Sequence, residues 1–473
     1  MLDILLISDD VAGEKMAGPG IRAWEVSKRL AKHFKVALAV PDYSPRSGDP
    51  GFYRSLPFEL HTYSVQAPER LLDIARQSRI VITQGYVLSK FPGIKDLDVH
   101  LICDLYVPFP LENLFVHKWK VANLKDREFI HLNDLRVFND QIMAGDHFLC
   151  ASERQRDLFT GALLSLNRIN PEVLDLCPDL DDLISVVHFG ITEDEADPPV
   201  PAGDAPRERV IRGVLPGVED TDIILFWGGV ITNWYDPATL LRAFARARET
   251  NPALKLFFIA KRHPNPLLPE FDLANEAVKL AGDMGLLDRS VFFNENWIDY
   301  ERKGLYFREA DIGISIHKTH FETYYSFRIR LLDYLKYELP ILCTDGDYFA
   351  NLVRKEGLGL TVASEDEDGL VRAILELAGD AEKRRAIKER LAAVKGRFTW
   401  DNVTGPLVAH CRKVLAGEAP KLRRPAAAEI ARICSLAPEG PARKAGKKIF
   451  WSLLHKLPFG MMTRIKRLLR RVR

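Results

Sequence analysis

The chain lacks several features that mark common classes of protein. Its 473 residues include only six cysteines, no two of them close together, which argues against a disulfide framework or a zinc site and predicts a reducing compartment. No run of about 18 apolar residues is present, so we expect no membrane-spanning helix. Met1 leads directly into a strand-like segment without a basic or apolar leader, which predicts no signal peptide.

Motifs that hold a metal ion are also scarce. We find no H-x-x-x-H pair, no cysteine cluster and no D-x-D directly after a strand. Asp179 and Asp181 form a D-x-D, but they fall in a polar, helix-like stretch and are expected to lie on a solvated face. The sequence therefore predicts no metal site and no cofactor.

A net charge of +1 hides a strong asymmetry. Residues 421–473 carry 15 lysines and arginines against two acids, so the rest of the chain is acidic. Within residues 447–473, apolar residues recur at three- and four-residue spacing between the cations, which predicts a helix in the interface of an anionic membrane. Packing on the protein's own surface and binding of RNA are the alternatives. The absence of interleaved aromatic residues disfavours nucleic acid.

Strand-like and helix-like segments alternate in two series. Short apolar segments are predicted as strands, among them 79–83 (RIVIT), 147–150 (HFLC), 254–260 (LKLFFIA) and 291–293 (VFF). They alternate with stretches predicted as helices, such as 237–250 and 399–415, which is typical of parallel sheets covered by helices. Residues 193–208, rich in Pro, Asp and Ala, separate the two series. We therefore predict an α/β chain of two doubly wound, Rossmann-like domains, 1–205 and 206–417, with a basic amphipathic helical tail at 418–473. This architecture alone does not select a function.

Each series contains a glycine loop that could approach a phosphate. Gly18 and Gly20 stand at a helix start in G-x-G-x-x-A, nine residues beyond the first strand, and Arg22 follows in the first turn. A dinucleotide turn would begin directly after the strand, so this longer loop better suits a diphosphate or sugar approached from across a cleft. A plain surface loop is the alternative.

The second glycine loop lies at the carboxyl end of a strand, where open α/β sheets bind ligands. It contains Gly228 and Gly229, and Asp236 and Pro237 are placed to cap and begin the next helix. A tight strand-to-helix turn explains the same residues.

Taken together, these segments resemble glycosyltransferases of family 4, which have the GT-B fold with two domains facing a cleft. The resemblance covers about residues 1–415. It rests on four segments in order: the glycine loop at 18–22, FLCASERQR at 148–156, VVHFGI at 186–191 and LLDYLKYELPILCTD at 331–345.

The resemblance implies a donor site around the last segment, where typical members place two glutamates eight residues apart. Here the second acid is Asp333, suited to accept hydrogen bonds from ribose hydroxyls. Tyr325 occupies the position eight residues earlier, and Glu322, eleven residues earlier, is the candidate for the first glutamate.

Typical members also hold the diphosphate with an Arg and a Lys in the loop that matches 228–237, and this loop has neither. A diphosphate leaving group needs compensating charge when no metal is present. Four cations near strand ends are the candidates for that charge: Lys261, Arg262, Arg328 and Arg330.

On the acceptor side, Asp104 directly follows the predicted strand 100–103, at the position where many members keep a His or Asp near the reacting carbon. Its carboxylate could orient or deprotonate an acceptor hydroxyl, and Glu112 is a second candidate. A loop or helix cap explains Asp104 equally well. Retention of configuration is implied by the resemblance alone.

The sequence thus predicts a hexosyltransferase-type enzyme that uses a nucleotide diphosphate sugar and no cofactor. With the tail, it suggests a lipid-linked acceptor in surface polysaccharide or glycolipid synthesis, and a cytoplasmic protein held on the inner face of the membrane. Two alternatives remain: a sugar-nucleotide epimerase of similar shape, which would need no membrane, and a degenerate GT-B scaffold without activity, which the missing Arg, Lys and first Glu would fit.

Overall fold

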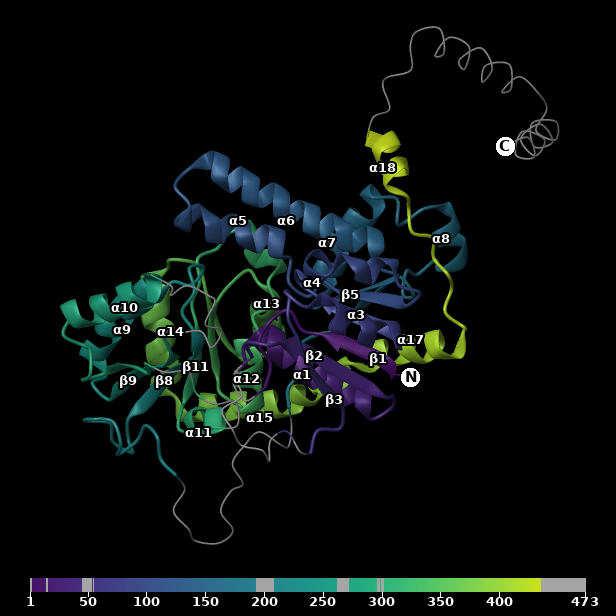
Figure 1. Cartoon of the computed structure of the whole chain (residues 1–473). Coiled ribbons are helices and arrows are strands. Elements are labelled where there is room, and N and C mark those ends of the chain that lie inside the picture. The colour runs from purple at the N-terminus through teal and green to yellow at the C-terminus, as the bar shows by residue number, and fades with distance from the viewer. Residues whose placement is uncertain are drawn as a thin grey trace, which may run out of the picture. The chain divides into compact units, whose positions relative to one another are not determined.

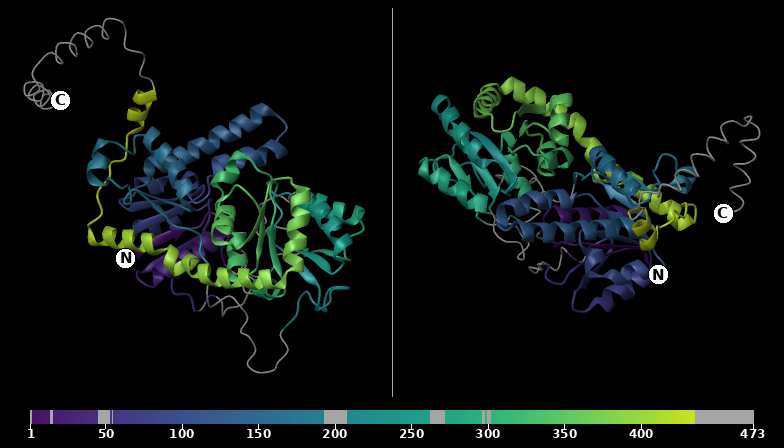
Figure 2. Two further views of the ribbon diagram at one scale, coloured as in Figure 1. Left: turned by 180° about the vertical axis from the view of Figure 1, so that it is seen from behind. Right: turned by 90° about the horizontal axis from the view of Figure 1, so that it is seen from above.

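The protein contains two parallel β-sheets with helices on their faces (Figures 1 and 2). The computed structural model describes residues 2–13, 16–44, 53, 55–192, 208–261, 272–295, 298 and 302–434. The first sheet has the strand order β3-β2-β1-β4-β5-β6-β7, and the second has the order β10-β9-β8-β11-β12-β13. The predicted α/β fold with two doubly wound units is confirmed. The predicted linker at 193–208 and most of the basic tail lie outside the described residues.

The elements of the first series run as follows: β1 (Leu2–Ile7), α1 (Gly18–Ala31), β2 (Val36–Pro41), β3 (Glu59–Tyr63), α3 (Pro68–Arg76), β4 (Ser78–Gln84), α4 (Val87–Lys90), η1 (Pro92–Asp96), β5 (His100–Asp104), α5 (Phe109–Lys120), α6 (Leu124–Ala144), β6 (His147–Cys150), α7 (Glu153–Ser165), α8 (Pro171–Leu176) and β7 (Ile184–Val186). All strand pairs in this sheet are parallel.

The second series continues with β8 (Ile223–Val230), α9 (Pro237–Thr250), β9 (Leu254–Ala260), α10 (Asp272–Asp283), β10 (Val291–Phe293), α11 (Lys303–Arg308), β11 (Ile312–Ser315), η3 (Phe321–Tyr325), α12 (Arg330–Lys336), β12 (Ile341–Thr344), α13 (Tyr348–Glu356), β13 (Gly359–Val362), α14 (Glu367–Gly379) and α15 (Ala381–Lys395). It ends with η4 (Gly396–Phe398), α16 (Trp400–Val403) and α17 (Gly405–Ala416). As predicted, Asp236 caps α9 by accepting a hydrogen bond from the Thr239 N–H, and Pro237 begins the helix.

Both faces of the first sheet are buried, which explains why its central strands are continuously apolar. Along β1, Ile4 and Leu6 belong to one core cluster, whereas Leu5 and Ile7 belong to another. Side chains alternate between the faces of a strand, so the two clusters are the cores above and below the sheet. The cluster around Ile4 continues into the second sheet, where it includes Phe226 of β8.

Three strands were not predicted from the sequence: β3, β7 and β13, each of which lies at an edge of its sheet. Only one of the five residues of β3 is buried, β7 has three residues, and only the last residue of β13 is buried. A short or half-exposed strand lacks the apolar run that identifies a buried one. The predicted helix at 399–415 is divided into α16 and α17. Asp179 and Asp181 lie in turns rather than in the expected helical stretch.

The chain returns to the first sheet after α15. Ile191 forms a parallel bridge with Thr399, and the Trp400 ring lies so close to Gly190 that a Cβ there would be 2.5 Å from it. In α17, His410 stacks on His147 of β6 with ring centroids 3.7 Å apart. The elements at the end of the second series therefore complete the hydrophobic core of the first sheet. The domain limits 1–205, 206–417 and 418–473 stay a prediction. Residues 425–473 form a separate unit, in which α18 (Ala427–Cys434) is described.

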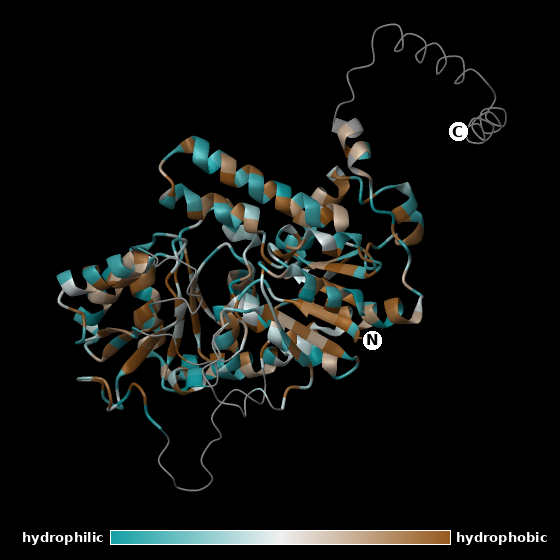
Figure 3. Ribbon diagram, in the orientation of Figure 1, coloured by the Kyte–Doolittle hydropathy of each residue, from teal (hydrophilic) through white to brown (hydrophobic). Residues whose placement is uncertain are grey.

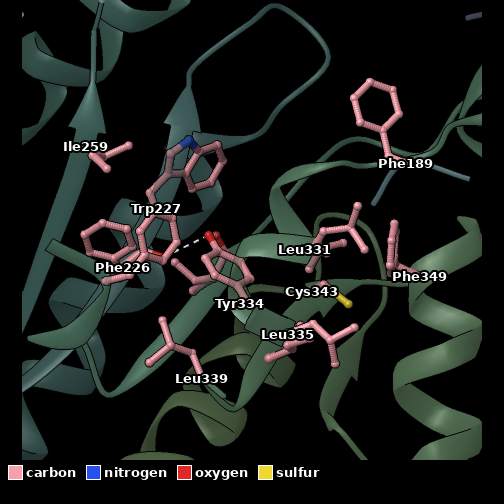
Figure 4. Packing of buried hydrophobic residues seen from close by; sticks show 14 of the residues in the cluster. Phe189, Phe226, Trp227, Ile259, Leu331, Tyr334, Leu335, Leu339, Cys343 and Phe349 are labelled. Carbon is pink, nitrogen blue, oxygen red and sulfur yellow. Dashed lines mark hydrogen bonds between the residues drawn. The ribbon is translucent and has the colours of Figure 1, made fainter. Parts of the chain in front are cut away.

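Tyr334 of α12 fixes the helix against the second sheet (Figure 4). Its hydroxyl accepts a hydrogen bond from the Gly228 N–H (2.9 Å) and lies 2.7 Å from the Ile314 carbonyl and 2.9 Å from the Phe226 carbonyl. Its ring lies over Gly313, where a Cβ would be 2.4 Å away. One buried hydroxyl therefore joins β8, β11 and α12 at the base of the second glycine loop.

We expect Tyr334→Phe to destabilise the protein while leaving its shape unchanged. The substitution removes a hydroxyl that is the partner of a buried N–H and of backbone carbonyls, and an unsatisfied buried group costs about 1–3 kcal/mol. Urea unfolding measures this loss. Tyr324→Phe is the matched control, because Tyr324 is 52% exposed and its loss should change stability by less than about 0.5 kcal/mol. Equal stability of both variants and the wild type would contradict this role for Tyr334.

Candidate functional site

A cavity of about 250 Å³ lies between the two glycine loops. Its walls come from the start of α1, the segment that follows β7, the end of β8 with the loop after it, α11 and α12. Five residues proposed from the sequence as donor-binding line it: Gly18, Gly228, Gly229, Arg330 and Asp333. The carboxyl ends of parallel strands meet at one edge of a sheet, and helices that begin there direct their N–H groups toward it. The cavity is therefore the candidate functional site.

Close packing explains why glycines stand here. A Cβ on Gly20 would lie 2.0 Å from the Val11 carbonyl oxygen, so this residue must be glycine for α1 to begin beside the loop. Gly20 does not line the cavity, and its role in the structure is this close approach. A Cβ on Gly229 would lie 3.2 Å from the Arg330 guanidinium. Gly229 thus leaves room for the Arg330 side chain at the end of β8.

Arg330 is the buried cation of the cavity. It is 7% exposed, and its Nη2 donates to the Val230 carbonyl at 2.7 Å. The guanidinium lies over the Tyr235 ring at 3.9 Å and the Trp227 ring at 4.8 Å, which holds its plane in place. Its other terminal nitrogen, Nη1, is buried and has no hydrogen-bond partner among the described residues. A buried charged donor without a partner is costly, so this nitrogen is suited to an anionic ligand oxygen.

Asp333 lies one turn further along α12 and forms an ion pair with Lys303, the first residue of α11. Both side chains are about one quarter exposed and line the cavity, as does Lys336. Neither Lys303 nor Lys336 was predicted from the sequence. Lys303 opens a one-turn helix with no glycine loop or family motif near it, so no sequence signal pointed to it. Lys336 lies three residues after Asp333, a spacing that places both on one face of the helix.

The structure gives Arg22 and Asp104 a different role from the one expected. Arg22 is fully buried, and its guanidinium forms two hydrogen bonds with the Asp104 carboxylate, at 2.6 and 2.9 Å. Its remaining terminal nitrogen donates to the carbonyls of Val187 and His188. Arg22 therefore does not add charge beside a phosphate in the cavity. It ties α1 to β5 and to the segment after β7, and it occupies both oxygens of the carboxylate proposed to deprotonate an acceptor.

Glu322 and Arg328 form a second polar cluster next to η3. Glu322 is 5% exposed, pairs with the Arg328 guanidinium at 3.3 Å and is hydrogen-bonded by the Ser326 hydroxyl. The three extra residues between Glu322 and Asp333 are accommodated by η3 and the segment that follows it. Arg328 does not line the cavity. Its charge is compensated within this cluster by Glu322 and, at 4.0 Å, by Asp347.

Glu112 faces the same cluster from α5. Burial, followed by the charge of Glu322, raises its pKa to about 7, and Arg328 partly opposes this rise. A carboxyl group with a pKa near neutrality can exchange a proton at physiological pH. Of the two candidates for the acceptor side, Glu112 therefore has a pKa near neutrality, whereas Asp104 is paired with Arg22.

The other two proposed cations are not brought to the cavity. Lys261 pairs with Glu295 at 3.2 Å at the end of β9 and does not line the cavity. Arg262 lies outside the described residues. No group of three or more His, Cys, Asp or Glu within the described ranges is arranged to hold a metal ion. Across the same ranges, no helix is long and apolar enough to cross a membrane.

Comparison with known proteins finds a family match within the second series of elements. Residues 221–380 match the family model described as glycosyl transferases group 1. This range contains β8, α12 and the second glycine loop, which are the parts that line one side of the cavity. No curated protein sequence matches the chain.

Solved structures show the fold of the whole two-sheet part. HepE from Anabaena, in complex with UDP and glucose, superposes with a TM-score of 0.60 at 13% identity, over 88% of this chain and 100% of that one. WaaG, a glycosyltransferase involved in lipopolysaccharide biosynthesis, has a TM-score of 0.58 at 13% identity and the same coverage. Sucrose-phosphate synthase from Thermosynechococcus elongatus has a TM-score of 0.57 at 15% identity, again over 88% and 100%.

These likenesses confirm the fold expected from the sequence, and the family match over residues 221–380 agrees with the resemblance to glycosyltransferases. The two parallel sheets, the cavity at their glycine loops and the match over 221–380 agree with one another. The two-sheet part of the chain has the GT-B fold, and its residues 221–380 match the family model of the glycosyl transferases group 1.

Proposed function

We propose that the protein transfers a hexose from a nucleoside diphosphate sugar, bound in the cavity between the glycine loops, to an acceptor hydroxyl. The observation that carries the proposal is Arg330, a buried cation with an unpartnered nitrogen, in the same cavity as the Asp333 carboxylate. A nucleoside diphosphate sugar presents both complementary groups, a diphosphate and ribose hydroxyls. The complex of HepE with UDP-glucose, a protein of the same fold, supports this class of donor.

In this proposal Arg330 and the backbone N–H groups near Gly228 and Gly229 hold the diphosphate. Their fixed positive charge stabilises the leaving group as the sugar–oxygen bond breaks, so no metal ion is required. Asp333 accepts hydrogen bonds from the ribose hydroxyls, and its ion pair with Lys303 holds the carboxylate in place. Lys336 adds a second cation on the same face of α12.

The sugar is proposed to lie toward Glu322, whose carboxylate is held by Arg328. Glu112 then takes up the proton of the acceptor hydroxyl, since its raised pKa suits a general base near neutral pH. Retention at the sugar carbon follows from the family resemblance and belongs to the proposal. So do a lipid-linked acceptor, a place in surface polysaccharide or glycolipid synthesis and attachment to the inner face of a membrane, which rest on the basic tail.

One assay separates this function from the two alternatives. Nucleotide sugars are incubated with the full-length protein and a lipid extract, and both the nucleotide and the sugar are followed. Release of nucleoside diphosphate with a glycosylated lipid supports transfer. Conversion of one nucleotide sugar into another would indicate an epimerase. No consumption of any nucleotide sugar by a folded protein would indicate a scaffold and overturn the proposal.

We expect Asp333→Asn to weaken donor binding. The change removes the charge from hydrogen bonds to the ribose, a loss of about 1–3 kcal/mol, and it leaves Lys303 without its partner. Calorimetric titration with UDP and with the intact donor measures the change. Asp283→Asn is the matched control, because it breaks the exposed pair with Lys279 on α10. If Asp333→Asn binds as tightly as this control, Asp333 does not contact the donor.

Arg330→Ala should lower kcat/KM by about 100-fold or more, as does the loss of a group that stabilises charge in the transition state. Lys261→Ala tests the other cation proposed for the same task, and an equal loss there would mean that Lys261 reaches the diphosphate in the complex. The activity of the wild type should survive EDTA. If EDTA abolishes turnover and magnesium restores it, compensation by protein cations alone is disproved.

Glu112→Gln should abolish the rise of kcat/KM with increasing pH. The raised pKa keeps Glu112 protonated below about pH 7, so wild-type activity should rise as the pH passes through that value. The free energy of unfolding should change in the opposite direction, because Glu112 in the unfolded chain ionises near its ordinary pKa of 4.5. As the pH rises from about 4.5 to 7, the wild type should therefore lose stability, whereas Glu112→Gln should not. Asp126→Asn, on the neighbouring helix, is the control. If kcat/KM of Glu112→Gln rises with pH as it does in the wild type, Glu112 is not the base.

A further inference from the structure

Helices α5 and α6 form an antiparallel hairpin that carries an unusual outer face (Figures 1 and 2). The inner face of α6 packs through buried residues such as Asp134, Val137 and Gln141. Its opposite face presents Phe129, which is 76% exposed, and Leu132, which is 64% exposed. This side of the helix therefore exposes two large apolar side chains that no described part of the chain covers.

Exposed apolar side chains are concentrated on this hairpin. Of the 12 large hydrophobic residues that are exposed among the described residues, four lie on it: Leu114, Leu124, Phe129 and Leu132. The bands of apolar residues along the two helices can be followed in Figure 3. Single exposed apolar residues are ordinary on a protein surface, whereas several gathered on one element mark an interaction site.

Cations border these apolar residues. Lys125 and Arg136 are exposed and stand at the i−4 and i+7 positions from Phe129, so they share its face of α6. Around the turn of the hairpin, residues 117–127 contain four lysines and arginines against the single acid Asp126. Lysine is depleted from interfaces between proteins, whereas helices that bind anionic membranes combine lysine and arginine with aromatic and aliphatic residues.

A small cavity opens between the two helices, on the side of α6 that carries Asp134. It is lined by Asn113, Leu114, His117, Leu124, Arg127, Glu128, His131 and Asp134. Asp134 is already bound by Tyr86 and Asn113. The Arg127 Nε and the His131 Nδ1 are buried and have no hydrogen-bond partner among the described residues. The cavity thus combines nitrogen atoms available to a phosphate with exposed leucines at its edge, Leu114 and Leu124.

We propose that the α5–α6 hairpin docks on the surface of an anionic phospholipid bilayer. Phe129, Leu132 and Leu124 enter the boundary between headgroups and acyl chains, and the lysines and arginines of the turn face the lipid phosphates. The cavity receives one phosphate headgroup at Arg127 and His131. This surface is distinct from the basic tail and does not depend on the transfer reaction proposed above, so it can be tested without activity.

A fluorescent label at position 129 tests the docking directly. Cys434→Ser leaves five cysteines, all buried, so Phe129→Cys can then be labelled selectively in the full-length protein with an environment-sensitive fluorophore. Vesicles of phosphatidylglycerol should shift its emission to the blue, and brominated acyl chains should quench it. Vesicles of phosphatidylcholine should do neither. A label at Leu164→Cys on α7, a position 62% exposed in the wild type, is the matched control and should stay in water.

A second measurement uses unlabelled full-length protein. Phe129→Ser with Leu132→Ser should lower the partition coefficient into phosphatidylglycerol vesicles by at least about tenfold, because both apolar anchors are lost. Leu164→Ser with Leu174→Ser removes two exposed leucines elsewhere and should leave it unchanged. Arg127→Gln should lower it less, while inorganic phosphate at millimolar concentration should not compete.

Two results would overturn the proposal. If the protein floats with vesicles while the label at position 129 stays in water, the tail carries all membrane binding. If the wild type is a dimer in light scattering and Phe129→Ser with Leu132→Ser makes it a monomer without affecting flotation, the face binds a second copy of the chain.

Discussion

The geometry of the site depends on the hydrogen-bond partners of two buried guanidinium groups near the strand ends of the two sheets, those of Arg22 and Arg330. Burying a guanidinium is costly unless its donors find partners. Arg22 meets this requirement entirely within the protein, through Asp104 and two backbone carbonyls, and thereby fixes the start of α1. Arg330 meets it only in part, because one terminal nitrogen stays without a partner among the described residues. One arginine holds a wall of the cavity, and the other is left to bind a ligand.

The residues around Arg330 hold its guanidinium in a fixed position in the cavity. Gly229 leaves space for its side chain, and the Tyr235 and Trp227 rings lie against its guanidinium. Tyr334, on the same helix, binds the backbone of β8 and β11 through one hydroxyl. A cation held this rigidly loses little conformational entropy when a diphosphate arrives, which is the physical basis of preorganised catalysis.

The acceptor side has a different electrostatic character. Glu112, Glu322, Arg328 and Asp347 share a buried region with more acids than bases, and burial raises the pKa of both Glu112 and Asp347, to about 7 and about 6. In the proposed reaction, protons are therefore exchanged on this side, while fixed positive charge lies on the proposed donor side. The α5 helix that carries Glu112 also forms half of the hairpin whose outer face we assign to a membrane. An acceptor held in that membrane would reach the reacting groups from the side where the proton is removed.

The sequence by itself determined the fold class, the two series and most central elements, because strands buried on both faces are apolar without interruption. Four segments were predicted with their observed bounds: β6, β9, β10 and α9. It also predicted Asp333, Arg330 and both glycine loops as parts of a donor site, and Gly18, Gly228, Gly229, Arg330 and Asp333 do line one cavity. Tertiary structure alone decided the rest. Whether Arg22 faces a ligand or Asp104, and whether Lys303 or Lys261 joins the cavity, depends on contacts between residues tens of positions apart. No local spacing encodes such contacts, because they form only when both sheets are in place.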